Sequence, residues 1–326
     1  MQESVDFEEI AKKLAADLSS QGISGPTLFD DGGKESFSPG VGPIEITVGN
    51  GGMAKVMLRH ADSAQEVEIY TYGAAVTSWK TRGIDALWVS EENKWQPGGK
   101  AIRGGIPLCF PQFGPYGDLV QHGFARVSEW MIEDTYVSTD GSVTAIFVLS
   151  SDKPNDAMTA WPYKFSAKYT VTLSVIGLET NFQVTNMDDK PFDVTMAFHN
   201  YFKTSDVNDA RIFGFEGLNF LNRLDGDKEQ GPEDDTGAGI LLARETDRIY
   251  LNAPEELAIF DFATLKIVKI KKTGTLPETT LWNPFGAEGA DPGWQKFICV
   301  EPACVAKPAT VAPGDTWIAS QLLGVE

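Results

Sequence analysis

Cysteine is scarce in this sequence of 326 residues, which contains only Cys109, Cys299 and Cys304. So few thiols cannot form a disulfide framework, and they favour a protein with free cysteines in a reducing compartment. The sequence also lacks an apolar run near the ~20 residues that span a bilayer, and it lacks the pattern of a secretory signal. We therefore expect a soluble cytoplasmic protein, with a plastid location after removal of a transit peptide as the alternative.

Positively charged residues are also few, because the sequence has 27 Lys and Arg residues against 46 Asp and Glu residues, which gives a net charge of -19. Such a surface repels nucleic acid and anionic membranes, so we expect neither as a partner. A small anion could still bind where a few arginines converge. The hydrophobic fraction of 42% is that of an ordinary globular protein.

Motifs for cofactors and metals are missing as well. The stretch "RGGIP" has two adjacent glycines but neither the dinucleotide nor the P-loop spacing. The three histidines, His60, His122 and His199, are far apart in the sequence, and none belongs to a short metal-ligand motif. We expect no cofactor and no metal requirement.

What the sequence does contain is a β pattern from about residue 46 onward. Apolar and polar residues alternate over residues 165–175 and again over 143–149, while 67–79 and 179–186 are rich in β-branched and aromatic residues. Convincing internal helices are almost absent. These patterns predict an all-β protein, a large antiparallel β-sandwich of two sheets.

Residues 1–45 differ from the rest and are expected to form a short N-terminal helical appendage with a linker. An acidic capping box precedes apolar residues at helical spacing, and the Gly/Pro-rich stretch "SPGVGP" follows. The apolar residues of this expected helix are Phe7, Ile10, Leu14 and Leu18. The predicted division is an appendage over 1–45 and one catalytic sandwich domain over 46–326.

One irregular stretch, "RGGIPLCFPQFGPYGDLVQHGFAR" over residues 103–126, carries polar groups on a loop shaped by glycine and proline. Arg103 and Arg126 flank it, and a guanidinium group offers two parallel donors to a carboxylate or a phosphate. The alternative for each arginine is a surface ion pair with one of the many acidic residues.

Two further residues point to proton transfer. Glu301 in "FICVEPAC" ends an apparently buried strand, where a carboxylate is costly unless it is paired or functional. His199 in "TMAFHNYF" has an apolar setting that equally suits a core histidine bonded to backbone. If the fold joins them, they form an acid and a base that need no cofactor. Asp247 in "ETDRIYL" also fits a turn or capping role.

The ordered set "RGGIPLCFPQFGP", "QHGFAR", "FHNYF", "ETDRIYL", "WNPF" and "CVEPA" resembles the hexose-6-phosphate mutarotases, or glucose-6-phosphate 1-epimerases, of the aldose 1-epimerase superfamily. The resemblance runs from about residue 46 to the end, and it implies a galactose mutarotase-like sandwich with its site in a cleft across one sheet. Asn200 replaces a threonine of some relatives, and residues 1–45 lie outside the family pattern.

By this resemblance, His199 corresponds to the general acid and Glu301 to the general base. The positions that match substrate-binding residues are Arg103, Gln121, Arg126 and Asp247, with His122 lining the pocket beside them and Asn283 as a further candidate. The implied reaction interconverts the α and β anomers of hexose 6-phosphates, chiefly glucose 6-phosphate, by ring opening and closure. We expect the acid and the base to flank the C1–O5 bond without touching each other.

A rival interpretation is a non-catalytic carbohydrate-binding or regulatory β-sandwich protein, since aromatic residues such as Trp79, Trp161 and Trp282 also make sugar platforms. Under both interpretations the partner is a small molecule, here a hexose phosphate. We expect a monomer.

Overall fold

The computed structural model of the chain describes residues 42–96, 98–233 and 237–326. Within these ranges the all-β class is confirmed, because every strand pair is antiparallel and the helices are six 3₁₀ helices of three residues each. They are η1 (Asn50–Gly52), η2 (Ala125–Val127), η3 (Asp156–Met158), η4 (Val207–Asp209), η5 (Arg223–Asp225) and η6 (Trp294–Lys296). The helix expected over residues 7–18 lies outside the described residues. In the described ranges, no helix has the length and apolar character needed to cross a membrane.

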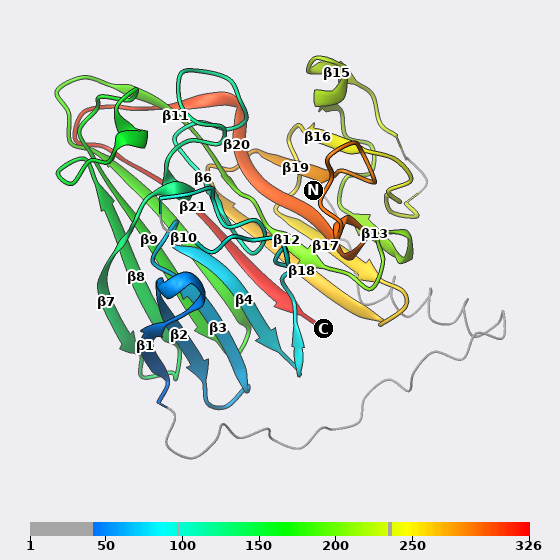
Figure 1. Cartoon of the computed structure of the whole chain (residues 1–326). Helices are drawn as coiled ribbons and strands as arrows, with labels where there is room; N and C mark the ends of the chain where they lie inside the picture. The colour runs from blue at the N-terminus through cyan, green and yellow to red at the C-terminus, as the bar shows by residue number, and fades with distance from the viewer. Residues whose placement is uncertain (1–41, 97, 234–236) are drawn as a thin grey trace.

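The N-terminal sheet has five strands in sequence order, coloured blue to cyan in Figure 1. Its strands are β1 (Ile44–Val48), β2 (Ala54–His60), β3 (Gln65–Tyr70), β4 (Ala75–Thr81) and β5 (Ile84–Asp85). The first strand begins slightly before the expected domain boundary at residue 46 and pairs with β2.

A second sheet of eight strands has the order β13-β17-β18-β21-β10-β9-β8-β7. Its strands are β7 (Met131–Val137), β8 (Val143–Ser150), β9 (Phe165–Ser174), β10 (Gly177–Asn186), β13 (Ala210–Phe213), β17 (Glu256–Asp261), β18 (Lys266–Gly274) and β21 (Thr316–Val325). The alternation predicted over residues 165–175 is confirmed in β9, where buried and half-buried residues alternate without a break, except that Val175 follows the end of the strand and is exposed.

The third sheet carries the candidate site and has the order β15-β14-β16-β19-β20-β11-β6, with β12 also paired to β20. Its strands are β6 (Leu108–Cys109), β11 (Phe192–Phe198), β12 (Tyr201–Lys203), β14 (Phe220–Asn222), β15 (Lys228–Gln230), β16 (Thr246–Tyr250), β19 (Glu278–Asn283) and β20 (Phe297–Val311).

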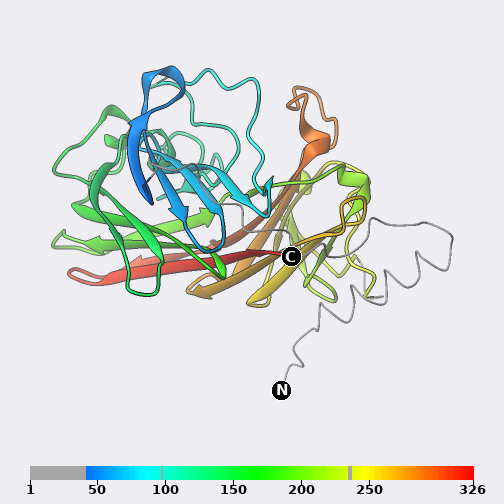
Figure 2. The same ribbon diagram turned by 90° about the horizontal axis from the view of Figure 1, so that it is seen from below.

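The sequence predicted two sheets, and the structure has three. The N-terminal strands hydrogen-bond to one another, and β2 and β3 then pack against β8 and β9. Figure 2 shows this stacking, with the N-terminal strands in blue above the green strands. The additional layer buries apolar residues of strands β2 to β4 in the main core, including Val56, Val67 and Trp79.

Alternation along β20 separates the core from the site. Ile298 and Val300 belong to the main hydrophobic core, together with Leu281 of the neighbouring strand β19. Successive side chains of a strand point to opposite faces. Cys299 and Glu301 therefore lie on the face of the sheet turned away from that core.

Candidate active site

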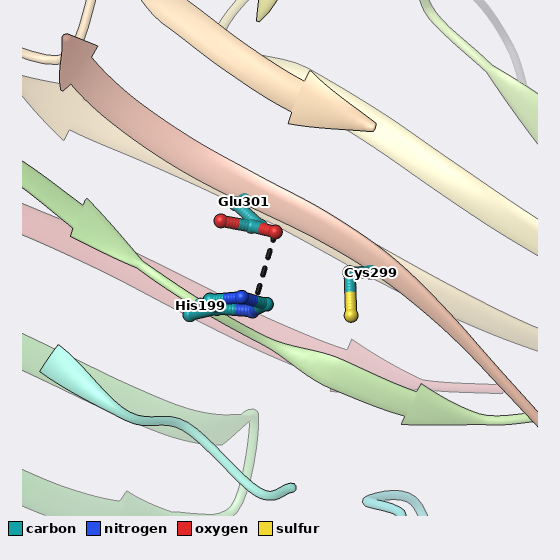
Figure 3. Close-up of side chains that lie close together, drawn as sticks. All are labelled: His199, Cys299 and Glu301. Atoms are coloured by element: carbon teal, nitrogen blue, oxygen red, sulfur yellow. Dashed lines mark ion pairs between the residues drawn. The ribbon is translucent and has the colours of Figure 1, made fainter. Parts of the chain in front are cut away.

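His199 and Glu301 meet because of strand register. Tyr201 of β12 pairs with Cys299 of β20, so in this antiparallel arrangement His199, two residues earlier, lies opposite Glu301, two residues later. Nδ1 of His199 is 3.2 Å from Oε1 of Glu301 (Figure 3). Among the described residues, neither this Nδ1 nor Oε2 of Glu301 has a hydrogen-bond partner. The expectation that the two side chains would not touch is wrong.

Both members of this pair are buried, with His199 6% and Glu301 1% exposed. Burial, followed by the positive charges of Arg126 and Arg103, lowers the pKa of His199 to about 3. Burial, followed by the negative charge of Asp247, raises the pKa of Glu301 well above its usual value. Desolvation disfavours the charged form of each group. The cavity thus favours a neutral imidazole beside a protonated carboxyl group.

The pair lies in a cavity of about 220 Å³ on this face of the sheet. Seven of the eight predicted site residues line it: Arg103, Gln121, His122, Arg126, His199, Asp247 and Glu301. Asn283, the eighth, does not. Its Nδ2 donates to the carbonyl oxygens of Trp294 and Phe297, and its Oδ1 accepts from the Phe285 N–H, so this side chain holds loop backbone instead of a ligand.

Arg103 is held at both its backbone and its side chain. Asn93 Oδ1 accepts from the Arg103 N–H at 2.9 Å, and Asn93 Nδ2 donates to the Arg103 carbonyl oxygen at 2.9 Å. The Arg103 Nε lies 3.5 Å from Oδ2 of Asp291, and its guanidinium group lies 5.7 Å from the ring centre of Trp282. These contacts aim a fixed positive charge at the cavity.

Arg126 supplies the second positive charge, and its Nη2 donates to the Gln121 carbonyl oxygen at 2.7 Å. The buried Nε atoms of Arg103 and Arg126 have no hydrogen-bond partner in the described ranges. Both arginines also line a wider neighbouring cleft of about 1220 Å³. They are therefore placed where an anion entering from that cleft would meet two guanidinium groups.

His122 is a neutral member of the cavity wall. Its Nδ1 accepts a hydrogen bond from the Gly114 N–H at 3.3 Å, which places the ring proton on Nε2. Burial is the main cause that lowers its pKa, and Arg126 adds to the effect. Its Nε2 lies 3.4 Å from the side-chain amide of Gln121, so His122 is an uncharged residue of the cavity wall that contacts a second predicted site residue.

Arg223 is a cavity residue that sequence reasoning missed. Its Nε lies 3.3 Å from Oδ1 of Asp247, and its guanidinium group lies 5.1 Å from the ring centres of both Phe113 and Tyr116. Burial raises the pKa of Asp247 to about 6, against the opposing effect of Arg223. The local sequence "FLNRLDGD" has no motif that marks this arginine; only its place beside Asp247 reveals it.

The backbone conformation after Arg103 requires glycine, as Gly105 shows. Gly105 has φ +69°, and a Cβ atom there would lie 2.0 Å from the Val76 carbonyl oxygen. Only glycine fits such a left-handed position in close contact with the backbone of β4. This explains why the motif that carries Arg103 reads "RGG".

Gly105→Ala is expected to destabilise the protein by more than about 3 kcal/mol, because the clash adds to a backbone strain of about 1–3 kcal/mol. Chemical denaturation measures the loss. Gly83→Ala is the matched control, since Gly83 has φ +75° but nothing within 4 Å of the added Cβ atom. Equal losses of stability in the two variants would show that the clash with Val76 does not contribute to the destabilisation.

Comparison with known proteins agrees with this geometry. A sequence profile described as "Aldose 1-epimerase" matches residues 55–324. A protein of Cenchrus ciliaris named "Putative glucose-6-phosphate 1-epimerase" is 37% identical over 278 residues, covering 82% of this chain and 83% of that protein. A protein of the same name from Escherichia coli K12 is 31% identical over 252 residues, covering 73% of this chain and 80% of that protein.

The fold has solved counterparts. The crystal structure of "a putative mutarotase (YeaD)" from Salmonella typhimurium aligns with a TM-score of 0.76 at 23% identity, over 94% of this chain and 99% of that one. The galactose mutarotase-like sandwich expected from the sequence is therefore confirmed. With the profile match over most of its length, the chain belongs to the aldose 1-epimerase family.

Proposed function

We propose that this protein interconverts the α and β anomers of a hexose 6-phosphate, chiefly glucose 6-phosphate. The observation that carries the proposal is the buried contact between His199 and Glu301 in a cavity that also presents Arg103 and Arg126. The names of the relatives from Cenchrus ciliaris and Escherichia coli support the phosphorylated substrate.

Ring opening requires two proton transfers, and the pair supplies both. Glu301 as a carboxylate removes the proton from the anomeric hydroxyl group, while His199 as an imidazolium donates one to the ring oxygen. Both oxygens are bonded to C1, so an acid and a base 3.2 Å apart can reach them together. Rotation about the C1–C2 bond and closure on the other face give the opposite anomer. Closure returns both protons, so the two residues reverse their roles.

The phosphate group has two tasks in this proposal. Arg103 and Arg126 bind the dianion, and the bound dianion offsets the two positive charges that lower the pKa of His199. Phosphate binding therefore favours the imidazolium form of His199 that the reaction uses. The ion pair of Arg223 and Asp247 offers a donor and an acceptor to the sugar hydroxyl groups.

A pH profile tests this link between phosphate and His199. Turnover that needs imidazolium falls as pH rises through the pKa of His199 in the complex. Because the dianion raises that pKa, the alkaline fall in kcat for glucose 6-phosphate should lie at higher pH than the fall for glucose. The measurement is enzymatic kcat for both sugars across the neutral and alkaline range, after subtraction of the spontaneous rate. Coincident profiles would contradict the link.

The proposed activity itself is tested by exchange NMR or polarimetry with α-glucose 6-phosphate. The enzyme should shorten the approach to anomeric equilibrium in proportion to its concentration. A protein that binds sugar without catalysis would leave that approach at the spontaneous rate. Membership of the aldose 1-epimerase family favours the enzyme over the carbohydrate-binding alternative.

We further propose that the protein is a monomer in the cytoplasm, with the plastid as the alternative compartment. The cysteines support a reducing compartment, since Cys109, Cys299 and Cys304 are all free and buried. Free thiols are usual where the environment is reducing. Light scattering at working concentration tests the monomer.

A further inference from the structure

We propose that His199, Cys299 and Glu301 form a binding site for a thiophilic divalent cation such as Zn²⁺ or Cd²⁺, and that the bound cation inhibits the enzyme. The three donor atoms, an imidazole nitrogen, a thiol sulfur and a carboxylate oxygen, lie within 4.8 Å of one another. Figure 3 shows the Cys299 sulfur beside the imidazole and the carboxylate group.

The backbone explains why these donors converge. Cys299 and Glu301 are two residues apart in β20, so their side chains project from the same face of the sheet. Tyr201 pairs with Cys299 in the same register that brings His199 opposite Glu301. The cluster therefore rests on regular strand pairing and needs no loop to close around an ion.

The donors are buried and have spare bonding capacity. Cys299 is 0% exposed, and Nδ1 of His199 and Oε2 of Glu301 have no hydrogen-bond partner among the residues described. Buried polar atoms usually have a hydrogen-bond partner, so these two atoms without one are exceptions. A cation would satisfy both atoms at once.

The donor set matches the preferences of zinc. Zn²⁺ binds Cys sulfur at about 2.3 Å, and His nitrogen and carboxylate oxygen at about 2.0–2.2 Å, in tetrahedral sites that often leave one position to water. Two donors of such an ion lie roughly 3.5 Å apart, so Cys299 needs to approach by roughly 1 Å. Binding forms the metal–sulfur and metal–oxygen bonds and breaks the S–H bond of Cys299 and the O–H bond of the Glu301 carboxyl group, and both protons pass to solvent.

Inhibition is the consequence that rests on the proposed function. The cation would occupy the nitrogen and oxygen atoms that exchange protons with the sugar, so metal and substrate cannot share the pair. A hard cation such as Mg²⁺, which prefers oxygen ligands and octahedral geometry, should not compete for this site. The site is thus inhibitory, and it adds no metal requirement to the reaction.

The binding test uses Cd²⁺ and does not depend on activity. Titration of the full chain should produce the ultraviolet charge-transfer absorption of a cadmium–thiolate bond, saturating at one equivalent. Cys299→Ser should abolish this band, and Cys299→Ala provides a second variant should the serine hydroxyl group disturb folding. Cys304→Ser is the matched control, because Cys304 is a buried cysteine on the same strand whose Sγ interacts with the Lys307 carbonyl oxygen. A band that persists in both Cys299 variants overturns the site.

The activity test compares inhibition of anomer exchange by Zn²⁺ in the same variants. Loss of groups that merely support metal ligands weakens binding about 10- to 100-fold, so removal of the thiol should raise the inhibition constant by at least that much. Zn²⁺ should inhibit Cys304→Ser as strongly as the unaltered protein. Mg²⁺ should inhibit neither of these two proteins. Equal inhibition of Cys299→Ser and the unaltered protein overturns the inhibitory role. Cadmium binding without any anomerase activity would instead contradict the proposed function and leave the metal site standing.

Discussion

His199→Asn should reduce enzymatic anomer exchange by about 10²- to 10⁴-fold, which is the usual contribution of a positioned acid or base. Asparagine keeps a polar group near the position of Nδ1, but it cannot carry a proton between two oxygens. The measurement is the catalysed rate for α-glucose 6-phosphate by exchange NMR, with the spontaneous rate subtracted.

The matched control for this variant is His60→Asn. His60 is another buried imidazole, 2% exposed, located in β2, and its Nδ1 interacts with the Ser63 hydroxyl group. Its loss should leave the rate of exchange nearly unchanged. Circular dichroism checks that both variants are folded. A folded His199→Asn protein with full activity would remove His199 from its proposed role.

Because His199 and Glu301 act together in the same ring-opening step, their variants should not be additive. Removing either residue should cost most of the acid-base contribution, and removing both should cost little more. Independent roles would instead multiply the two losses. The double variant His199→Asn with Glu301→Gln therefore distinguishes a coupled pair from two separate catalytic groups.

The fold class could be predicted because burial on one side of a strand shows directly in a period of two residues. β9 follows this rule over its whole length. The separate N-terminal sheet could not be predicted in the same way. The N-terminal strands carry the same kind of pattern as the others, and which strands pair with one another depends on contacts between residues that are distant in the sequence.

The site could be predicted where a residue stands in a marked motif, as for Arg103 and Arg126 beside their glycines. Arg223 has no motif, and its role becomes visible only when β14 and β16 pair and bring its helix beside Asp247. Asn283 shows the opposite error. It stands in the marked motif "WNPF", yet its amide group is fully used by backbone partners, which the sequence does not reveal.

Arg126→Ala should raise KM for glucose 6-phosphate by about 10- to 150-fold, since a hydrogen bond to a charged group contributes about 1.5–3 kcal/mol. The same variant should change KM for glucose only slightly, because glucose presents no dianion to this side of the cavity. Initial rates for both sugars measure the effect. Equal effects on the two would contradict the phosphate assignment.

Arg211→Ala is the control, because Arg211 is a half-buried arginine of β13 whose guanidinium group lies over Phe262, outside the cavity. It should alter neither KM. The sharper result concerns kcat for glucose. Without a bound dianion, Arg126 lowers the pKa of both His199 and Glu301, so its removal favours the acid but disfavours the base, and the turnover of glucose should change little. A large loss for glucose 6-phosphate with an almost unchanged rate for glucose would tie Arg126 to the phosphate group, since a general loss of structure would slow both.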